Sequence, residues 1–329
     1  MKPEDLLSLA RGFMESRILL SGAELDLFTL LAPGPLTAEE VWQRVGARTR
    51  TPRAITTLLD ALAALGLLDK QQDRYRTAAD AAPLVADAPG SVLPMVLHAA
   101  GLWHTWNELT SIVRETGAPA QPSSERRGPQ DLQAFIGAMH AVGRPVAARI
   151  AAAVDPGPAR ALLDVGGATG TYSEAFLAAS PALRATIFDL PPVIELARAR
   201  LQQTGLLDRV TLVAGDYHED PLPAGHDLAL LSAVIHSNSP EQNLALYRKV
   251  FDALVPGGRI VIRDHVMEAT RTRPRAGAIF AINMLVGTAG GGTYTSDEIR
   301  GGLEQAGFSR VRLLQHGEHM DGLVEGFRP

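Results

Sequence analysis

A glycine-rich turn between a short apolar run and a helical segment is the feature that most constrains how this chain folds. The segment ALLDVGGATGTYSEAFLAA, residues 161–179, reads as a strand, a tight turn and the start of a helix. Gly166, Gly167 and Gly170 remove side chains where the backbone must turn sharply and approach a ligand. The beginning of the helix offers free N–H groups to a carboxylate or another anion. The order strand, loop, helix therefore predicts a ligand site on an α/β fold.

The second half of the chain predicts a mostly parallel sheet. From about residue 158, short apolar runs are separated mainly by helical patterns, which is typical of a parallel sheet covered on both faces. The runs are ALLDV, ATIFDL, VTLVAG, LALLSAV and RIVIRDHV. SRVRLLQ and GLVEGFRP lie close together at the end and predict a final antiparallel pair. We therefore expect a Rossmann-like α/β domain over residues 156–329.

The acids that end the next two runs indicate a nucleoside ligand. Asp189 ends the second run, 25 residues after Asp164, where an acid can accept hydrogen bonds from both ribose hydroxyls. NAD-binding folds share this acid, so it does not identify the nucleoside. Asp216 and Tyr217 follow the third run, where Asp216 could accept from an adenine amine and Tyr217 could pack on the ring. Alternatively, Asp189 is an acid that caps the turn after its strand. The alternatives for Asp216 and Tyr217 are a loop acid and a surface aromatic.

Residues 1–85 predict helices followed by a hairpin. SRILLSGAELDLFTLL, residues 16–31, has apolar side chains at helical spacing. Thr37 and Glu40 form a capping-box pattern at the start of a second helix. A third helix occupies TPRAITTLLDALAALG, and LLDKQQDRYRTA predicts a hairpin with its turn near Gln72 and Asp73. This order is typical of a winged-helix-like domain.

The third helix of this domain argues against DNA binding. Arg53 is its only basic residue, and most of its other positions are Leu, Ala and Thr. Large apolar surfaces are rarely left exposed to water, so we expect the domain to bury an apolar face in a dimer.

Residues 86–155 predict a helical linker, with a loop rich in Pro, Ser, Arg and Gly at 118–129. Pockets favour domain junctions and are mostly apolar and aromatic. The aromatic and apolar side chains of this segment are therefore candidates for the wall of a substrate pocket, and the alternative is core packing between domains. The candidates are Trp103, Trp106, Phe135, Met139 and His140.

Composition excludes several classes of function. The chain has 329 residues, enough for two domains, and its net charge of −5 disfavours nucleic acid and anionic membranes. The absence of cysteine excludes disulfides and thiolate metal sites, and the His and acid residues show no clear metal-ligand spacing, so we expect no metal. No apolar run approaches the roughly 18–20 residues of a membrane span, and the N-terminus does not read as a signal peptide. We expect a cytoplasmic protein.

These motifs together resemble the plant-type small-molecule O-methyltransferases and their bacterial relatives. LLDVGGATG, FDLP, AGDYHEDPLP and LVPGGRIVIRDHV carry the resemblance over nearly the whole chain. LVPGGR discriminates best, because a Pro-Gly-Gly turn before the fifth strand is not expected in the NAD-binding family. The resemblance implies a seven-stranded sheet with its last strand antiparallel, S-adenosyl-L-methionine as cofactor, a small-molecule acceptor and a homodimer formed through residues 1–85. The cofactor-binding residues that it implies are Asp164, Gly166, Gly167, Gly170, Asp189, Leu190, Asp216, Tyr217 and Ser232.

The same resemblance implies a catalytic base. SAVIHSNSPEQN, residues 232–243, matches the family segment that carries it: His236 is retained, while Ser237 and Asn238 replace an Asp-Trp pair. The family orients its histidine with two acids, of which Asp264 matches one and Thr293 stands in place of the other. We expect His236 to act as a general base with Asp264. Alternatively, the acceptor is already acidic, or is a carbon or a nitrogen, and the enzyme supplies mainly proximity.

Three further expectations concern the surroundings of this base. Asn283 and Met284 are candidates for the pocket wall. The glycine run 290–292 predicts a close backbone approach or a flexible lip. Because side chains alternate along a strand, His265 should point to the opposite face from Asp264.

Three other functions remain open from the sequence. An NAD-dependent oxidoreductase would share the glycine-rich loop and Asp189. A regulator would use a winged helix on DNA and sense a nucleoside with its α/β domain. A relative that binds the cofactor without methylating is the third, because one acid and the Asp-Trp pair are missing.

Overall fold

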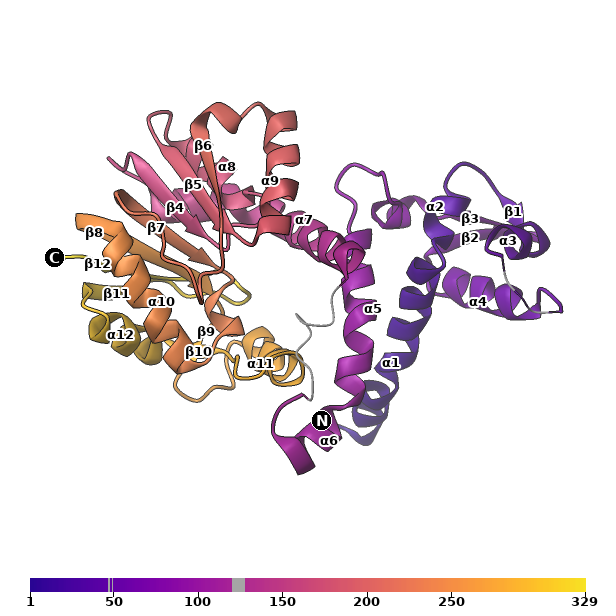
Figure 1. Ribbon diagram of the computed structural model, residues 1–329. Helices are drawn as coiled ribbons and strands as arrows, with labels where there is room; N and C mark the ends of the chain where they lie inside the picture. Colours follow the sequence, from indigo (N-terminus) through magenta and orange to yellow (C-terminus); the bar gives the residue numbers. More distant parts are fainter. Residues whose placement is uncertain (47, 49, 120–127) are drawn as a thin grey trace. The chain divides into compact units, whose positions relative to one another are not determined.

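The computed structural model describes residues 1–46, 48, 50–119 and 128–329 and divides into two units (Figure 1). Unit 1 contains residues 1–103 and 137–142, and unit 2 contains residues 104–136 and 143–329. The expected middle segment, residues 86–155, is thus shared between the two units. Most of its predicted loop, residues 120–127, lies outside the described residues.

Unit 1 is helical with one small sheet. A core of buried side chains that includes Phe28, Leu59 and Tyr75 holds its helices against the hairpin. The elements of the first 84 residues are α1 (Pro3–Glu24), α2 (Leu27–Leu31), β1 (Leu36–Thr37), α3 (Ala38–Arg44), α4 (Arg53–Ala64), β2 (Leu68–Gln71), β3 (Arg74–Thr77) and the 3-10 helix η1 (Ala79–Leu84). The strands pair in the order β1-β3-β2.

The capping box and the hairpin that the sequence predicts in this unit are confirmed, and one predicted helix is not. The Thr37 hydroxyl accepts from the backbone N–H of Glu40, whose carboxylate accepts from the N–H of Thr37, so the capping box is present. The hairpin turns at Gln72, whose φ is 56°. The single helix expected over residues 16–31 is wrong. The chain breaks between α1 and α2 at Asp26, which adopts the left-handed conformation with φ of 50°.

Helical segments pass through the described residues of the middle of the chain. They are α5 (Leu93–Asn107), α6 (Leu109–Ser111) with the π-helical turn η2 (Ile112–Thr116), and α7 (Pro129–Val154). Among the described residues, no helix is both long and apolar enough to span a membrane.

Unit 2 is built on a seven-stranded sheet with the order β11-β12-β8-β7-β4-β5-β6. β12 runs antiparallel to both of its neighbours, and the other pairs are parallel, so the predicted topology is confirmed. The strands are β4 (Ala161–Val165), β5 (Arg184–Asp189), β6 (Val210–Ala214), β7 (His226–Ser232), β8 (Leu254–Asp264), β11 (Ser309–Gln315) and β12 (Gly322–Phe327). β9 (Val266–Met267) and β10 (Tyr294–Thr295) form a separate parallel pair.

Helices cover both faces of this sheet, because each strand presents apolar side chains alternately to the two faces. One buried cluster joins Leu163 and Ile262 to α10 (Pro240–Ala253) and α12 (Ser296–Gln305). The other joins Leu162 and Val261 to the end of α7 and to α8 and α9. The remaining elements of the unit are α8 (Thr171–Ala179), α9 (Pro191–Thr204), η3 (Leu207–Arg209), η4 (Ile235–Ser237) and α11 (Arg275–Gly287).

The parallel strands β4 to β8 end at a common edge of the sheet, which collects the residues that follow them (Figure 1). Ligands of open α/β sheets bind at this carboxyl edge.

Candidate active site

The glycine-rich loop joins β4 to α8 and has no room for a side chain at its three glycines. Gly166 and Gly170 have φ of 67° and 77°, in the left-handed region that favours glycine. A Cβ on Gly166 would lie 2.9 Å from a Val234 methyl, and one on Gly170 would lie 2.7 Å from Ile187 Cδ1. The N–H of Gly166 donates to the carbonyl of Phe188 at 2.8 Å, which ties the loop to the next strand. The predicted tight turn is therefore confirmed.

Asp164 lies buried beneath this loop. Its Oδ2 accepts from the Ser173 hydroxyl at 2.7 Å, and a Cβ on Gly167 would come within 2.7 Å of its carboxyl carbon. Burial raises the pKa of Asp164 to about 6. Its Oδ1 has no hydrogen-bond partner among the described residues. The carboxyl group thus packs against the backbone of the loop at Gly167. Its contact with a cofactor stays a prediction.

Asp189 occupies the tip of β5 beside the loop. Its Oδ2 accepts from the N–H of Ala168 at 2.8 Å, and its Oδ1 accepts from the N–H of Leu190 at 2.7 Å. Burial raises the pKa of this carboxyl group above its ordinary value. A carboxylate has about four acceptor positions, so each oxygen keeps capacity for one more donor. Two free acceptor positions would serve the two hydroxyls of a ribose, and this contact stays a prediction.

Asp216 and Tyr217 follow β6 at the same edge. Asp216 Oδ1 accepts from the N–H of His218 at 2.8 Å, so this acid caps its own turn. A Cβ on Gly166 would lie 4.0 Å from the ring of Tyr217, which places that ring against the glycine-rich loop. Burial raises the pKa of Tyr217 to about 12. Their contact with an adenine stays a prediction.

His236 and Asp264 form a buried pair beyond β7 and β8. Nδ1 of His236 lies 2.9 Å from each carboxylate oxygen of Asp264, and the two residues are 8% and 1% exposed. The N–H of His265 also donates to Asp264 Oδ1 at 2.8 Å, which fixes the carboxylate. An imidazole that donates through Nδ1–H keeps Nε2 as a proton acceptor. The arrangement can therefore take a proton from a bound molecule.

The glycine run supports the turn that carries His236. The N–H of Gly292 donates to the carbonyl of His236 at 2.9 Å. A Cβ on Gly291 would collide with that carbonyl oxygen and would lie 2.6 Å from Thr288 Oγ1. The predicted close backbone approach is therefore confirmed at Gly291. Thr293 follows, is buried, and supplies no carboxylate, so Asp264 is the one acid that contacts His236 among the described residues.

Asn238 forms a polar network that the sequence did not predict. It is buried, and its Nδ2 donates to Asn243 Oδ1 at 3.1 Å. The Tyr217 hydroxyl donates to its Oδ1 at 3.4 Å, and the Tyr294 hydroxyl donates to its carbonyl oxygen. The residue that replaces the family's tryptophan thus connects the turn of His236 to the segment after β6.

His265 lies beside the pair. Its ring packs on Phe280 at a centroid distance of 4.9 Å, and His236 contacts the same Phe280 ring edge-on, also at 4.9 Å. The expectation that His265 faces away is wrong, because β8 ends at Asp264 and the alternation of side chains ends with it. Burial lowers the pKa of His265.

The candidate pocket residues divide between the two units. Trp106, Phe135, Asn283 and Met284 belong to unit 2 with the His236–Asp264 pair, and the other candidates, Trp103, Met139 and His140, belong to unit 1. The Trp106 indole N–H donates to Asn283 Oδ1 at 3.0 Å, so two candidates distant in sequence are in contact. Met284 is buried, and its carbonyl accepts from the Thr288 hydroxyl at 2.7 Å. Their role as a pocket wall stays a prediction.

Ser232 ends β7 and contacts a residue that the sequence reasoning missed. Arg263 on β8 donates from Nη1 to Ser232 Oγ at 3.1 Å, and its guanidinium carbon lies 4.6 Å from the centre of the Tyr172 ring. The signal that was available is an arginine inside the otherwise apolar run RIVIRDHV.

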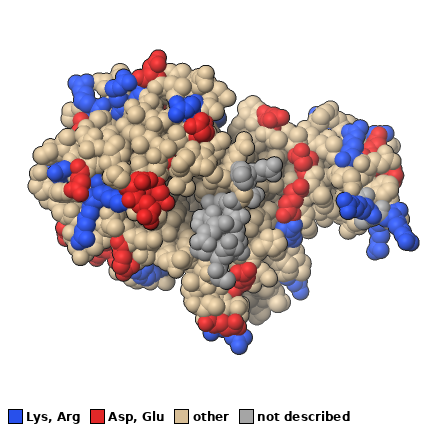
Figure 2. All heavy atoms as spheres, in the orientation of Figure 1, with Lys and Arg blue, Asp and Glu red and all other residues tan. Residues whose placement is uncertain are grey.

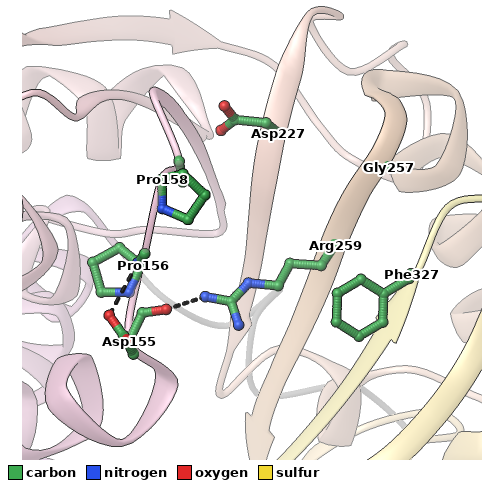
Figure 3. A pocket seen from close by; sticks show the side chains of 9 residues that line it. Asp155, Pro156, Pro158, Asp227, Gly257, Arg259 and Phe327 are labelled. Carbon is green, nitrogen blue, oxygen red and sulfur yellow. Dashed lines mark hydrogen bonds between the residues drawn. The ribbon is translucent and has the colours of Figure 1, made fainter.

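A cavity of about 380 Å³ lies at the opposite edge of the sheet, where β7 and β8 begin (Figure 3). Arg259 in its wall donates to the carbonyl oxygens of Val154 and Asp155 and pairs with Glu325 at 3.1 Å. These groups satisfy one another, so this cavity does not compete with the carboxyl edge as the site of chemistry. On the face drawn in Figure 2, acidic and basic side chains are mixed over unit 2.

Comparisons with known proteins agree with this geometry. The O-methyltransferase domain family matches residues 106–309, and the O-methyltransferase dimerisation domain family matches residues 7–87. Over 94% of the chain and 92% of the relative, the sequence is 35% identical to the tetracenomycin polyketide synthesis 8-O-methyl transferase TcmO of Streptomyces glaucescens. Over 99% of the chain and 95% of the relative, it is 34% identical to the 3-hydroxy-5-methyl-1-naphthoate 3-O-methyltransferase of Streptomyces sahachiroi. The solved structure of PigF with SAH matches all of both chains with a TM-score of 0.90 and 26% identity.

The seven-stranded sheet with its one antiparallel strand defines a class I methyltransferase fold. The chain belongs to the O-methyltransferase family that pairs this catalytic domain with an N-terminal dimerisation domain. It is an S-adenosylmethionine-dependent O-methyltransferase. The alternative of an NAD-dependent oxidoreductase is therefore excluded.

Proposed function

We propose that this enzyme methylates a phenolic hydroxyl on a fused-ring, polyketide-like molecule, with His236 as the general base. The observation that carries the proposal is the contact of His236 Nδ1 with both oxygens of Asp264 at the carboxyl edge of the sheet. Support for the acceptor class comes from the two relatives that are 35% and 34% identical, which are named for a tetracenomycin polyketide and for a hydroxynaphthoate.

A base is needed because the acceptor is protonated at neutral pH. S-adenosylmethionine supplies a methyl group on a sulfonium cation, and a phenol has a pKa of about 10. Asp264 holds Nδ1–H of His236, so that Nε2 can take the phenol proton as the oxygen attacks. The buried carboxylate then stabilises the imidazolium cation that forms. In this proposal Asp264 alone orients the imidazole, because Thr293 stands at the position of the family's second acid.

The residues along the edge fit the cofactor in the order of the strands. Asp216 and Tyr217 after β6 would receive the adenine, and Asp189 after β5 would accept from the ribose hydroxyls. The glycines of the loop after β4 would leave backbone N–H groups open to the ligand. Ser232 after β7 would face the amino-acid half.

The acceptor would lie against the aromatic side chains near His236. Phe280 contacts His236 edge-on, and Trp106 is fixed by Asn283 on the same helix as Phe280. Apolar rings beside the base suit a fused-ring acceptor. Phe135 and Met284, two predicted pocket residues of the same unit as His236, belong to the same proposal.

We also propose a homodimer formed through the N-terminal domain. The helix α1 leaves five large apolar side chains more than half exposed in the single chain, and the dimerisation domain family covers them except for the first. They are Leu6, Leu7, Leu9, Phe13 and Met14. A second copy of the chain would remove this surface from water. In this reading the winged-helix-like order of α3, α4 and the β2–β3 hairpin serves assembly and not DNA.

The acceptor assignment is tested by product analysis. The purified enzyme is incubated with S-adenosylmethionine and a panel of hydroxynaphthalenes and hydroxyanthraquinones, and S-adenosylhomocysteine release and product structure are measured. We expect an O-methyl product, and no turnover with the matched compounds whose hydroxyl is already a methyl ether. Methylation of the matched aminonaphthalenes in preference to the phenols, or attachment of the methyl group to carbon, would refute the phenolic assignment.

A further inference from the structure

Arg263 is a buried cation that forms no ion pair with any residue in the described part of the chain. The side chain is charged, yet the residue is only 6% exposed. It lies on β8 between the apolar Ile262 and the acidic Asp264. Nη1 donates to Ser232 Oγ at 3.1 Å, and the guanidinium stacks on the ring of Tyr172. Its buried Nε has no hydrogen-bond partner among the described residues. Leaving a buried donor of a charged group unsatisfied costs free energy, so this arrangement calls for an anion.

The acids around Arg263 already have other partners. Asp264 accepts from His236 and from the N–H of His265, and Asp321 pairs with Arg149 at 3.1 Å. Neither lies within ion-pair distance of the guanidinium, and burial lowers the pKa of Arg263. An anion supplied by a ligand would offset this cost.

Its neighbours place Arg263 at the cofactor edge. Ser232 is the last residue of β7 and is in register with Arg263. Tyr172 is the second residue of α8, directly after the glycine-rich loop, and it presents its ring to the guanidinium. Arg263 therefore lies among groups that flank the loop, at the end of the strand row that runs from β6 through β5, β4 and β7 to β8.

We propose that Arg263 binds the carboxylate of the amino-acid half of S-adenosylmethionine. This inference rests on the proposed function only in that the cofactor binds along the carboxyl edge of the sheet. With adenosine over β6 and β5, the amino-acid half would extend along the strand row toward β7 and β8, where Ser232 and Arg263 lie. The planar guanidinium offers several N–H donors, which suits a carboxylate. The other anion that could occupy the site is a carboxylate on the acceptor.

Two ligands separate these possibilities. S-adenosylhomocysteine carries the carboxylate, whereas 5′-methylthioadenosine keeps the adenosine and the sulfur and lacks the amino-acid half. Isothermal titration calorimetry gives both dissociation constants for the wild type and for Arg263→Met. We expect the variant to lose about 10- to 100-fold in affinity for S-adenosylhomocysteine and less than about twofold for 5′-methylthioadenosine. Arg198→Met, an exposed arginine on α9, is the matched control and should change neither affinity.

Arg263→Lys keeps the proposal testable if the methionine variant does not fold. It preserves the charge and removes the planar fork, so we expect a smaller loss that is again confined to S-adenosylhomocysteine. In the wild type, an S-adenosylhomocysteine analogue that lacks only the carboxylate should bind at least about tenfold more weakly. Equal losses for both ligands, no loss for either, or a change only in the KM of acidic acceptors would overturn the proposal.

The proposed function fails separately from this inference. If Asp189→Asn leaves both affinities unchanged while Arg263→Met lowers only the affinity for S-adenosylhomocysteine, the ribose assignment falls and the carboxylate assignment stands.

Discussion

Nδ1 of His236 lies 2.9 Å from both carboxylate oxygens of Asp264, and both residues are buried. The contact selects the tautomer of the imidazole that carries its proton on Nδ1. It also keeps a negative charge beside the ring, where an imidazolium would form. Orientation of the His236 ring, the proposed base, therefore depends on Asp264.

Asp264→Asn tests this orientation. The amide has nearly the same shape, but it can donate to Nδ1 and so favours the tautomer with the proton on Nε2, which cannot accept one. We expect kcat to fall by about 10- to 1,000-fold with little change in cofactor affinity. Asp252→Asn, an exposed carboxyl group on α10, is the control. Unchanged turnover in Asp264→Asn would show that the carboxylate does not orient the base.

The carbonyl of His236 depends on a neighbouring glycine. A Cβ on Gly291 would collide with it, whereas a Cβ on the adjacent Gly292 would meet nothing within 4 Å. We expect Gly291→Ala to displace the His236 turn and to lower kcat roughly tenfold or more, because base and acceptor lose alignment. Gly292→Ala should retain nearly full activity. Equal kcat values for the two variants would mean that this close approach does not position the base.

Asp189 should govern cofactor affinity. Replacing it with Asn removes the negative charge and one of the acceptors that we propose for the ribose hydroxyls. We expect S-adenosylhomocysteine to bind roughly 10- to 100-fold more weakly, as measured by calorimetry. Asp208→Asn is a control at an exposed position in η3. An affinity equal to that of the wild type would refute the ribose assignment.

Asp164 makes stability depend on pH in a defined direction. Burial raises its pKa in the folded state to about 6, above the unfolded value of about 3.9. The folded state thus binds the proton more tightly, and its contribution to stability declines as the pH rises from about 4 to above 6. Asp164→Asn removes this titration. The free energy of unfolding of the ligand-free variant, minus that of the wild type, should rise by about 1–2 kcal/mol when the pH is raised from 4.5 to 7.5.

The measurement is urea unfolding of both proteins at the two pH values. Comparing differences between them cancels any constant effect of the amide on packing around Ser173. A difference that does not vary with pH would show that Asp164 does not titrate in this range.

The strands β4 to β8 and the glycine-rich loop were predictable because local sequence determines them. Apolar runs, glycines and acids at the ends of runs identify β4, β5 and the ligand edge without any tertiary information. The contact of His236 with Asp264 was expected from the family resemblance and is present. These features depend on period, turn chemistry and position along the chain.

The features that were missed depend on tertiary packing. The break at Asp26 requires a left-handed residue inside an otherwise continuous helical pattern, and propensity does not reveal it. His265 contacts Phe280 because β8 ends one residue earlier, at Asp264. A sequence pattern does not locate the end of a strand to within one residue, so this contact was not predicted. Arg263 packs on the ring of Tyr172, which is 91 positions away in the sequence. The sequence therefore showed an arginine in an apolar run but did not indicate the ring that it contacts.

Single-turnover methyl transfer by His236→Ala tests the central claim most directly. The enzyme, saturated with S-adenosylmethionine, is mixed with whichever hydroxynaphthalene the product analysis identifies as the acceptor, and S-adenosylhomocysteine binding is measured on the same preparation. We predict a rate about 100- to 10,000-fold below that of the wild type, a deficit that shrinks for acceptors of lower pKa, and a cofactor affinity within about twofold. The exposed His316→Ala should match the wild type. A His236→Ala rate equal to the wild-type rate would contradict the account.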